Sequence, residues 1–290
     1  MSAAAELPNR RVEAWRYSDL RATVGEARHV LRDGRDIIER LAPGTQRLRV
    51  PAGEQRVFIE RMDDDRYMDA RAFDWDVGAG ATLTRVVIQY GAELPLSIAR
   101  VRLAEGASLR QLVFAEGARL ARIETQVSVE GAGGAVELNG LYLCGAGRHA
   151  DLTSVIEHTA PGGTTRQLIK GAARGGGRGV FQGKIVVARE AQKTDARQHH
   201  QGTLLEEGAE IFAKPELMIH ADDVQCAHGN TAGGLDDAAL FYLRSRGVPE
   251  AQARALLIAS FLLEALPEWT PDEARAEIED RVDAWLGDAP

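Results

Sequence analysis

Glycine is distributed unevenly along this chain of 290 residues, and its distribution limits the folds available to it. Twenty-four of the 30 glycines lie between Gly78 and Gly234, a stretch that is just over half of the chain. Short segments that alternate apolar and polar residues lie between the glycines, and the clearest runs from Ala121 to Glu130. Such alternation is typical of half-buried β-strands, so the odd-numbered residues of this segment are predicted to face a core and the even-numbered ones water.

A short motif recurs between these alternating segments. Glu-Gly-Ala, then any residue, then Leu or Ile, begins at Glu105, Glu116 and Glu207. The segments lack the intervening amphipathic helices that βαβ units require, so the repeat predicts a mainly β fold of short strands and glycine turns. Frequent turns of similar composition favour a β-solenoid, in which each coil stacks on its neighbour. A β-sandwich with glycine-rich hairpins is the alternative.

The sequence after Gly234 changes to helical periodicity. A short helix is predicted over residues 235–247, with an Asp start and a Gly stop. A second helix begins at Pro249 and ends before Pro267, and a third follows a capping box at residues 270–273. The apolar positions expected to be buried are Ala253, Leu256, Leu257 and Phe261 in the second helix, and Ile278, Val282, Trp285 and Leu286 in the third.

Composition excludes several classes of protein. The net charge of −8 has the wrong sign for a chain that binds nucleic acid mainly through its phosphates. The most apolar run, Ala255 to Leu263, is about half the ~20 residues that a membrane-spanning helix needs. Two cysteines far apart, Cys144 and Cys226, indicate a reducing compartment rather than a disulfide framework, and residues 1–16 lack the apolar core of a signal peptide. We therefore expect a cytoplasmic protein with no nucleic-acid or membrane partner.

Common catalytic signatures are absent. The glycine-rich stretch at residues 171–179 does not have the spacing of a phosphate-binding loop, and no serine lies in a nucleophile elbow. Asp63 to Asp65 is interpreted as a solvated turn. A basic stretch from Arg166 to Arg189 carries six positive charges and no acidic residue; outward-facing strand residues are the favoured interpretation, and an anion or partner patch is the alternative.

The densest group of metal-ligating residue types lies within nine positions, at His220, Asp222, Asp223, Cys226 and His228. Cys226 and His228 are two residues apart, so in an extended strand they lie on the same face with Cα atoms about 6–7 Å apart. They cannot complete a structural zinc site, which normally needs four ligands. Either these two residues are packing residues, or they form part of a site that another chain completes. Adjacent His199 and His200 are weaker candidates because they face opposite ways.

Several motifs resemble one family. Pro215 to Ile219, Ala221 to Val224, Cys226 to Gly229 and Leu240 to Gly247 resemble the C-terminal signature of the SufB/SufD family of the SUF iron–sulfur cluster assembly system. Residues 180–187 and 193–196 resemble the preceding strands, and Glu13 to Leu20 is similar to an N-terminal motif. The Cys-Ala-His-Gly sequence at 226–229 and the Gln-Gly-Thr at 201–203 are similar to the SufD branch rather than to the SufB branch.

The resemblance implies a right-handed parallel β-helix over residues 51–234, a short N-terminal helical segment over residues 1–50 and a C-terminal helical module over residues 235–290. It implies a non-enzymatic scaffold subunit that pairs with a SufB-like paralogue, with a homodimer as an option for the isolated chain. The family's functional histidine falls on His228, with Cys226 beside it, where iron or a transient iron–sulfur cluster would be shared with the paralogue. The helical module is expected to bind a SufC-like ABC ATPase through Asp236, Leu240, Phe241, Tyr242, Leu243, Arg244, Arg246, Leu257 and Phe261.

Two other functions stay open at this point. One is a β-solenoid enzyme that acts on acidic polysaccharide, with the basic stretch at 166–189 as its substrate site. The other is a free-standing homodimeric iron chaperone that uses the same His228 site. The subunits that co-purify with the chain would separate these hypotheses.

Overall fold

The computed structural model describes residues 7–24 and 37–287. The parts of the predicted N-terminal segment at 1–6 and 25–36 lie outside the described residues. In the described part of that segment, a 3-10 helix η1 (Glu13–Trp15) and helices α1 (Leu20–Val24) and α2 (Ile37–Leu41) precede the first strand, which begins at Thr45.

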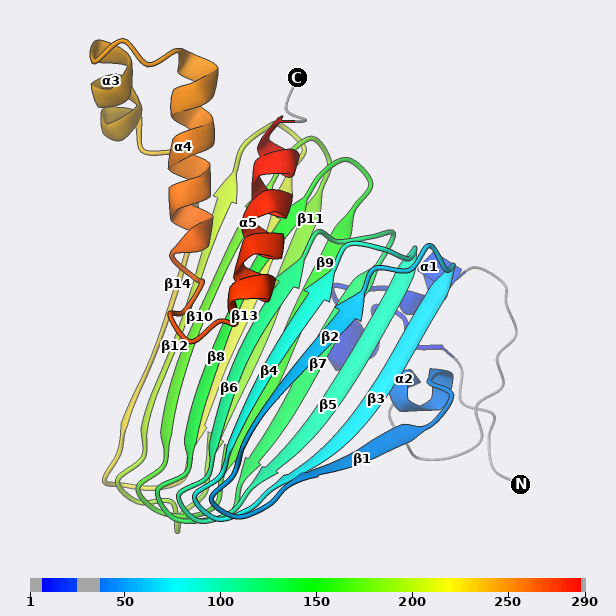
Figure 1. The fold of residues 1–290 in the computed structure, drawn as a ribbon, viewed down its shortest axis with the longest axis vertical. Coiled ribbons are helices and arrows are strands. Elements are labelled where there is room, and N and C mark those ends of the chain that lie inside the picture. The colour runs from blue at the N-terminus through cyan, green and yellow to red at the C-terminus, as the bar shows by residue number, and fades with distance from the viewer. Residues whose placement is uncertain (1–6, 25–36, 288–290) are drawn as a thin grey trace.

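The chain forms a parallel β-solenoid of two seven-stranded sheets (Figure 1). Odd-numbered strands form one sheet and even-numbered strands the other, so each coil contributes one strand to each sheet. The odd sheet contains β1 (Thr45–Val50), β3 (Met68–Val77), β5 (Leu94–Leu103), β7 (Ala121–Val129), β9 (His149–His158), β11 (Arg178–Val187) and β13 (Glu210–Ile219). The even sheet contains β2 (Gln55–Met62), β4 (Thr82–Gln89), β6 (Ser108–Ala115), β8 (Ala135–Cys144), β10 (Thr164–Ala173), β12 (Asp195–Leu204) and β14 (Gln225–Gly233).

This topology confirms the predicted solenoid and shows that the sandwich alternative is wrong. Hairpins would join antiparallel neighbours, whereas strands that are neighbours in these sheets pair in parallel. Successive coils stay in register, so equivalent residues form columns. Val101, Val127 and Ile156 form one such column inside the odd sheet, and they belong to a continuous buried core.

Six of the seven turns that lead from the odd sheet to the even sheet share one backbone conformation. In five of them a glycine has a positive φ and donates its amide to a carbonyl in the turn of the next coil. These glycines are Gly53, Gly80, Gly106, Gly133 and Gly162. In the sixth turn Lys193 takes the same place, with a φ of 64°. The clustering of glycine that marks this sequence therefore has a physical cause, because only glycine adopts this conformation without strain.

The alternation predicted for Ala121 to Glu130 is confirmed on its inner face and is wrong at two outer positions. Ile123, Val127 and Val129 are buried in the core as predicted. Arg122 and Glu124, predicted to face water, are also buried. They are covered because the N-terminal segment packs on the outer face of the odd sheet, where Arg122 donates to the carbonyl oxygen of Ala14 over 2.8 Å.

Three helices follow the solenoid; the first packs on the second, and the second and third contact the outer face of the even sheet (Figure 1). They are α3 (Asp237–Ser245), α4 (Glu250–Leu263) and α5 (Asp272–Gly287), in agreement with the three predicted helices. The buried residues of α5 include Ile278, Val282 and Trp285 as predicted, whereas α4 buries Ala253, Ile258 and Leu262 and leaves Leu256 half exposed. The apolar face of α4 is therefore rotated from the predicted one, because it packs on the sheet around Leu141 and Ala172. Within residues 7–24 and 37–287, no helix is long and apolar enough to cross a membrane.

Candidate metal-ligand site

Cys226 and His228 lie on β14, the last strand of the even sheet. The final coil, β13 and β14, has no further coil stacked on it, and most of its residues are exposed or only half buried. The side chains that would face the interior of a longer solenoid are therefore accessible here. A metal-ligating side chain on this coil can therefore be contacted by a second protein chain.

The register places both residues on the inner face of β14. Cys226 pairs with Ala196 and His228 pairs with Gln198, and both partners are fully buried. Cys226 packs against the main hydrophobic core, while His228 is exposed. The prediction that the thiol and the imidazole share a face is consistent with this register.

The chemistry of the two residues differs because their environments differ. Burial raises the pKa of the Cys226 thiol, so at neutral pH the thiol is protonated unless a metal displaces the proton. The other cysteine, Cys144, is fully buried and its pKa is raised to about 12, so it behaves as the core residue that the sequence indicated. Among the residues that the structure describes, no three His, Cys, Asp or Glu side chains are grouped to hold a metal. The described residues by themselves therefore offer an incomplete ligand set.

The rest of the predicted cluster is dispersed by the turn between β13 and β14. His220 lies exposed just after β13, and Asp222 and Asp223 are exposed in the turn itself. Asp223 forms an ion pair with Lys193 rather than facing Cys226. His199 and His200 face opposite ways as predicted, with His199 exposed and His200 buried.

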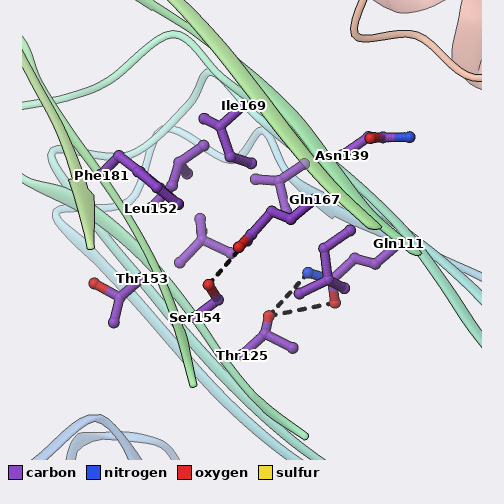
Figure 2. A pocket seen from close by; sticks show the side chains of 12 residues that line it. Gln111, Thr125, Asn139, Leu152, Thr153, Ser154, Gln167, Ile169 and Phe181 are labelled. Atoms are coloured by element: carbon purple, nitrogen blue, oxygen red, sulfur yellow. Dashed lines mark hydrogen bonds between the residues drawn. The ribbon is translucent and has the colours of Figure 1, made fainter. Parts of the chain in front are cut away.

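A line of polar groups inside the solenoid was not predicted from the sequence. Arg85 is fully buried and bonds Glu60 over 2.5 Å and Gln111 over 2.8 Å. Farther along, the amide of Gln167 donates to Ser154 over 2.8 Å, beside a cavity of about 20 Å³ (Figure 2). That space holds about one water molecule, so this cavity is not a substrate pocket.

A second unpredicted feature is the buried docking site of the N-terminal motif. Ser18 donates to the buried carboxylate of Asp151, which also accepts from Arg122 over 2.9 Å. The guanidinium of Arg122 lies 4.1 Å from the ring centre of Trp15. Burial lowers the pKa of neighbouring His149 to about 4, so this ring is neutral at physiological pH. The signal in the sequence is the oppositely charged pair Arg122 and Glu124, which occupy polar positions of the alternating strand and are predicted from that pattern to face water.

The residues predicted to bind an ATPase divide into an exposed group and a structural group. Phe241 and Tyr242 on α3 are 74% and 57% exposed, and Arg246 lies over the Tyr242 ring. In contrast, Leu240 is buried, and Asp236 caps α3 by accepting from the amides of Ala238 and Ala239. The remaining members are Leu243 and Leu257, which are half buried, exposed Arg244, and Phe261, which packs against the even sheet beneath Lys170.

The basic stretch at 166–189 is not one surface in the structure. Lys170 and Arg174 meet the C-terminal helices on the even sheet, where Lys170 pairs with Glu264 and Arg174 lies over Trp285. Arg178, on the odd sheet, pairs with Glu210. Arg166 is also paired, with Asp195. These pairs agree with the favoured interpretation, in which the charges are strand residues rather than a single patch.

Comparisons with known proteins point to one family. Residues 45–261 match the family model described as SUF system FeS cluster assembly, SufBD core domain. The chain is 33% identical to the iron–sulfur cluster assembly protein SufD of Escherichia coli over 226 residues, which are 76% of this chain and 53% of that protein. It is 31% identical over 234 residues to a SufBD family protein of Mycobacterium tuberculosis, which covers 78% of this chain and 59% of the relative. It is 36% identical over 171 residues to the chloroplastic protein ABCI7 of Arabidopsis thaliana, and these residues are 59% of this chain and 36% of that protein.

The chain thus spans little more than half the length of SufD and of the mycobacterial relative. Mycobacterium bovis contains two relatives, 31% and 26% identical to this chain, so family members occur as paralogues. The family model covers the whole solenoid together with α3 and most of α4. From this match we conclude that the chain belongs to the SufBD family of iron–sulfur cluster assembly proteins and is SufD-like.

Proposed function

We propose that this chain is a non-catalytic scaffold subunit of a SUF complex. It pairs with a SufB-like paralogue, binds a SufC-like ATPase, and contributes His228, with Cys226 beside it, to a site where iron or a nascent cluster is held between the two chains. The observation that carries the proposal is an incomplete pair of metal ligands on a terminal coil, on which no further coil of the described chain stacks.

The open coil is suited to pairing with a second solenoid. β13 and β14 each have a neighbour on one side only, so one edge of each strand has backbone groups free to bond another chain. Met218 and Ile219 at the end of β13 are both more than 40% exposed, which gives this edge an apolar component. A paralogue on this edge would lie next to the inner face that carries Cys226 and His228.

The donor set also fits the proposed cargo. Thiolate and imidazole are both ligands of iron–sulfur centres, and a metal favours the deprotonated thiol. Two donors leave coordination positions for a partner to fill. A paralogue that supplies the remaining ligands would therefore hold the cargo only while the two chains are assembled, as a scaffold requires.

Helix α3 is the proposed binding surface for the ATPase. It lies at the far end of α4, away from the solenoid (Figure 1). Exposed aromatic side chains such as Phe241 are frequent anchors of protein interfaces. Because α4 and α5 bury apolar residues of the even sheet, including Leu112 and Leu141, removal of everything after Gly234 would expose this core. Surface substitutions on α3 are therefore the appropriate test of binding.

The structure gives no support to the polysaccharide-enzyme alternative. The interior cavity in Figure 2 is too small for a polysaccharide, and the basic stretch that would have bound one is divided between two sheets. Both cysteines are free, which suits a cytoplasmic location. A free-standing homodimer would use the same edge of the solenoid, and the mass of the native complex distinguishes it from a heteromeric one.

A cellular assay tests the role of His228. His228→Ala is expected to accumulate to normal levels, because the side chain is exposed, and to abolish SUF-dependent activity of iron–sulfur enzymes. His199→Ala is the matched control, since His199 is an exposed histidine on the neighbouring strand and faces away from the interior. Full enzyme activity with His228→Ala would remove this residue from the function.

A further inference from the structure

Three aromatic rings lie together inside the last coils of the solenoid. His200 on β12 is almost completely buried, and its ring stacks on Phe181, with centres 5.2 Å apart, and on Tyr142, with centres 6.0 Å apart. Tyr142 is on β8, two strands away in the same sheet, and it reaches His200 because Gly171 on the intervening strand has no side chain. A Cβ atom on Gly171 would lie 1.9 Å from the Tyr142 ring.

The two ring nitrogens of His200 have different partners. Nδ1 lies 2.7 Å from Oδ1 of Asn230 on β14, and Nε2 lies 3.0 Å from the hydroxyl of Tyr142. The amide oxygen of Asn230 can only accept, so Nδ1 carries the proton and donates it. Burial lowers the pKa of His200, so the ring is neutral and Nε2 accepts from the Tyr142 hydroxyl. The hydrogen bonds thus run in one direction, from Tyr142 through His200 to Asn230.

Asn230 occupies a particular place on the terminal strand. It lies two residues after His228 and therefore on the same inner face. β14 is an edge strand, held by its backbone to β12 alone. Among the described residues, Asn230 is the only side chain of β14 that forms a hydrogen bond with another side chain.

We propose that Asn230 is a positioning residue, and that the hydrogen bond from His200 fixes the inner face of β14 and thereby holds His228 in place at the open end of the solenoid. The role assigned to His228 rests on the proposed function, whereas the anchoring of β14 does not. Loss of the acceptor would leave the buried Nδ1–H without a partner. Loss of this one hydrogen bond is enough to raise the equilibrium constant for local opening of β14 on the order of tenfold.

Amide hydrogen exchange of the full chain tests the anchor. Asn230→Leu keeps the approximate volume and removes the acceptor, so exchange of residues 225–233 is expected to become about tenfold faster. Asn230→Asp keeps an acceptor and should restore protection. Thr231→Leu is the matched control, on the same strand and the opposite face, and should leave exchange nearly unchanged. Unchanged exchange in Asn230→Leu, or equally fast exchange in Asn230→Asp, would overturn the proposal.

A spectroscopic measurement separates positioning from general stability. In ¹⁵N-histidine-labelled protein, His200 should show a protonated Nδ1 and a bare Nε2, and Asn230→Asp should raise the pKa of His200 because a carboxylate favours the charged ring. A His200 signal with the proton on Nε2 would contradict the assigned direction of the hydrogen bonds from Tyr142 through His200 to Asn230.

Cell assays separate this inference from the proposed function. If Asn230→Leu loosens β14 yet supports normal cluster assembly, the positioning role fails while the role of His228 stands. If His228→Ala supports normal assembly, the proposed function fails, and the exchange result still reports the anchor. The combined expectation is that Asn230→Leu impairs assembly, Asn230→Asp restores it, and His228→Ala abolishes it.

Discussion

The backbone amide of Lys193 donates to the carbonyl oxygen of Asp223 over 2.6 Å, in the turn position that glycine occupies in the five preceding coils. The hydrogen bond continues the ladder that joins the turns of successive coils. Lys193 makes it with a positive φ, a conformation that costs a residue with a Cβ atom about 1–2 kcal/mol. This sixth turn of the ladder is therefore strained where the five before it are not.

Relief of this strain gives the first prediction. Lys193→Gly should increase the free energy of unfolding by about 1 kcal/mol, because the exposed ion pair that it removes, with Asp223, is worth little. Lys193→Ala should bring no such gain, since alanine keeps the unfavourable conformation. Denaturant titration of both variants measures the difference. A Lys193→Gly protein no more stable than Lys193→Ala would show that the turn is not strained.

Gly171 is predicted to tolerate no side chain. Gly171→Ala would place a methyl group 1.9 Å from the Tyr142 ring and should destabilise the fold by about 3 kcal/mol, since the ring is fully buried. Gly234→Ala is the control, because a Cβ atom there meets nothing within 4 Å. In a double-mutant cycle, Tyr142→Leu should recover part of the loss caused by Gly171→Ala. Purely additive effects of the two changes would disprove the contact.

Stability should fall in mild acid through His158. Burial lowers the pKa of this buried histidine to about 4, whereas the unfolded chain has the ordinary value near 6.5. Between these values the unfolded state binds the proton and the folded state does not, so stability is present above pH 6.5 and is lost as the pH falls towards 4. The difference between the folded and unfolded pKa values of His158 corresponds to about 3 kcal/mol in the free energy of unfolding. His158→Gln should have a shallower slope between pH 6.5 and 4 in denaturant titrations, and an unchanged slope would assign the effect to other groups.

The exposed face of α3 should bind the ATPase without contributing to stability. Phe241→Asp should leave the melting temperature within a few degrees of wild type, because the side chain is mostly exposed, and should reduce co-purification of a co-expressed SufC-like ATPase at least tenfold. Arg254→Asp, at an exposed position on α4, is the control and should retain binding of the ATPase. Retention of the ATPase by Phe241→Asp would place the binding surface elsewhere.

The sequence was sufficient to predict the solenoid and the shared face of Cys226 and His228, because both depend on local periodicity. It did not predict that Arg122 would be buried, since the segment that covers it, around Trp15, is more than 100 positions away in the chain. The bond between His200 and Asn230 was missed for the same reason, as it depends on coil register. Gly171, a glycine inside a strand, was a signal of close approach that could have indicated the ring of Tyr142.

The most direct test of the account is the native mass and iron content of the complex formed when this chain is co-expressed anaerobically with a SufB-like paralogue and a SufC-like ATPase. We predict an assembly with one copy of this chain, one of the paralogue and two of the ATPase, which binds iron in the wild type and loses it in His228→Ala while its mass is unchanged apart from the lost iron. A complex without the paralogue, or equal iron in the wild type and His228→Ala, would contradict the claim that His228 holds cargo shared between the two chains.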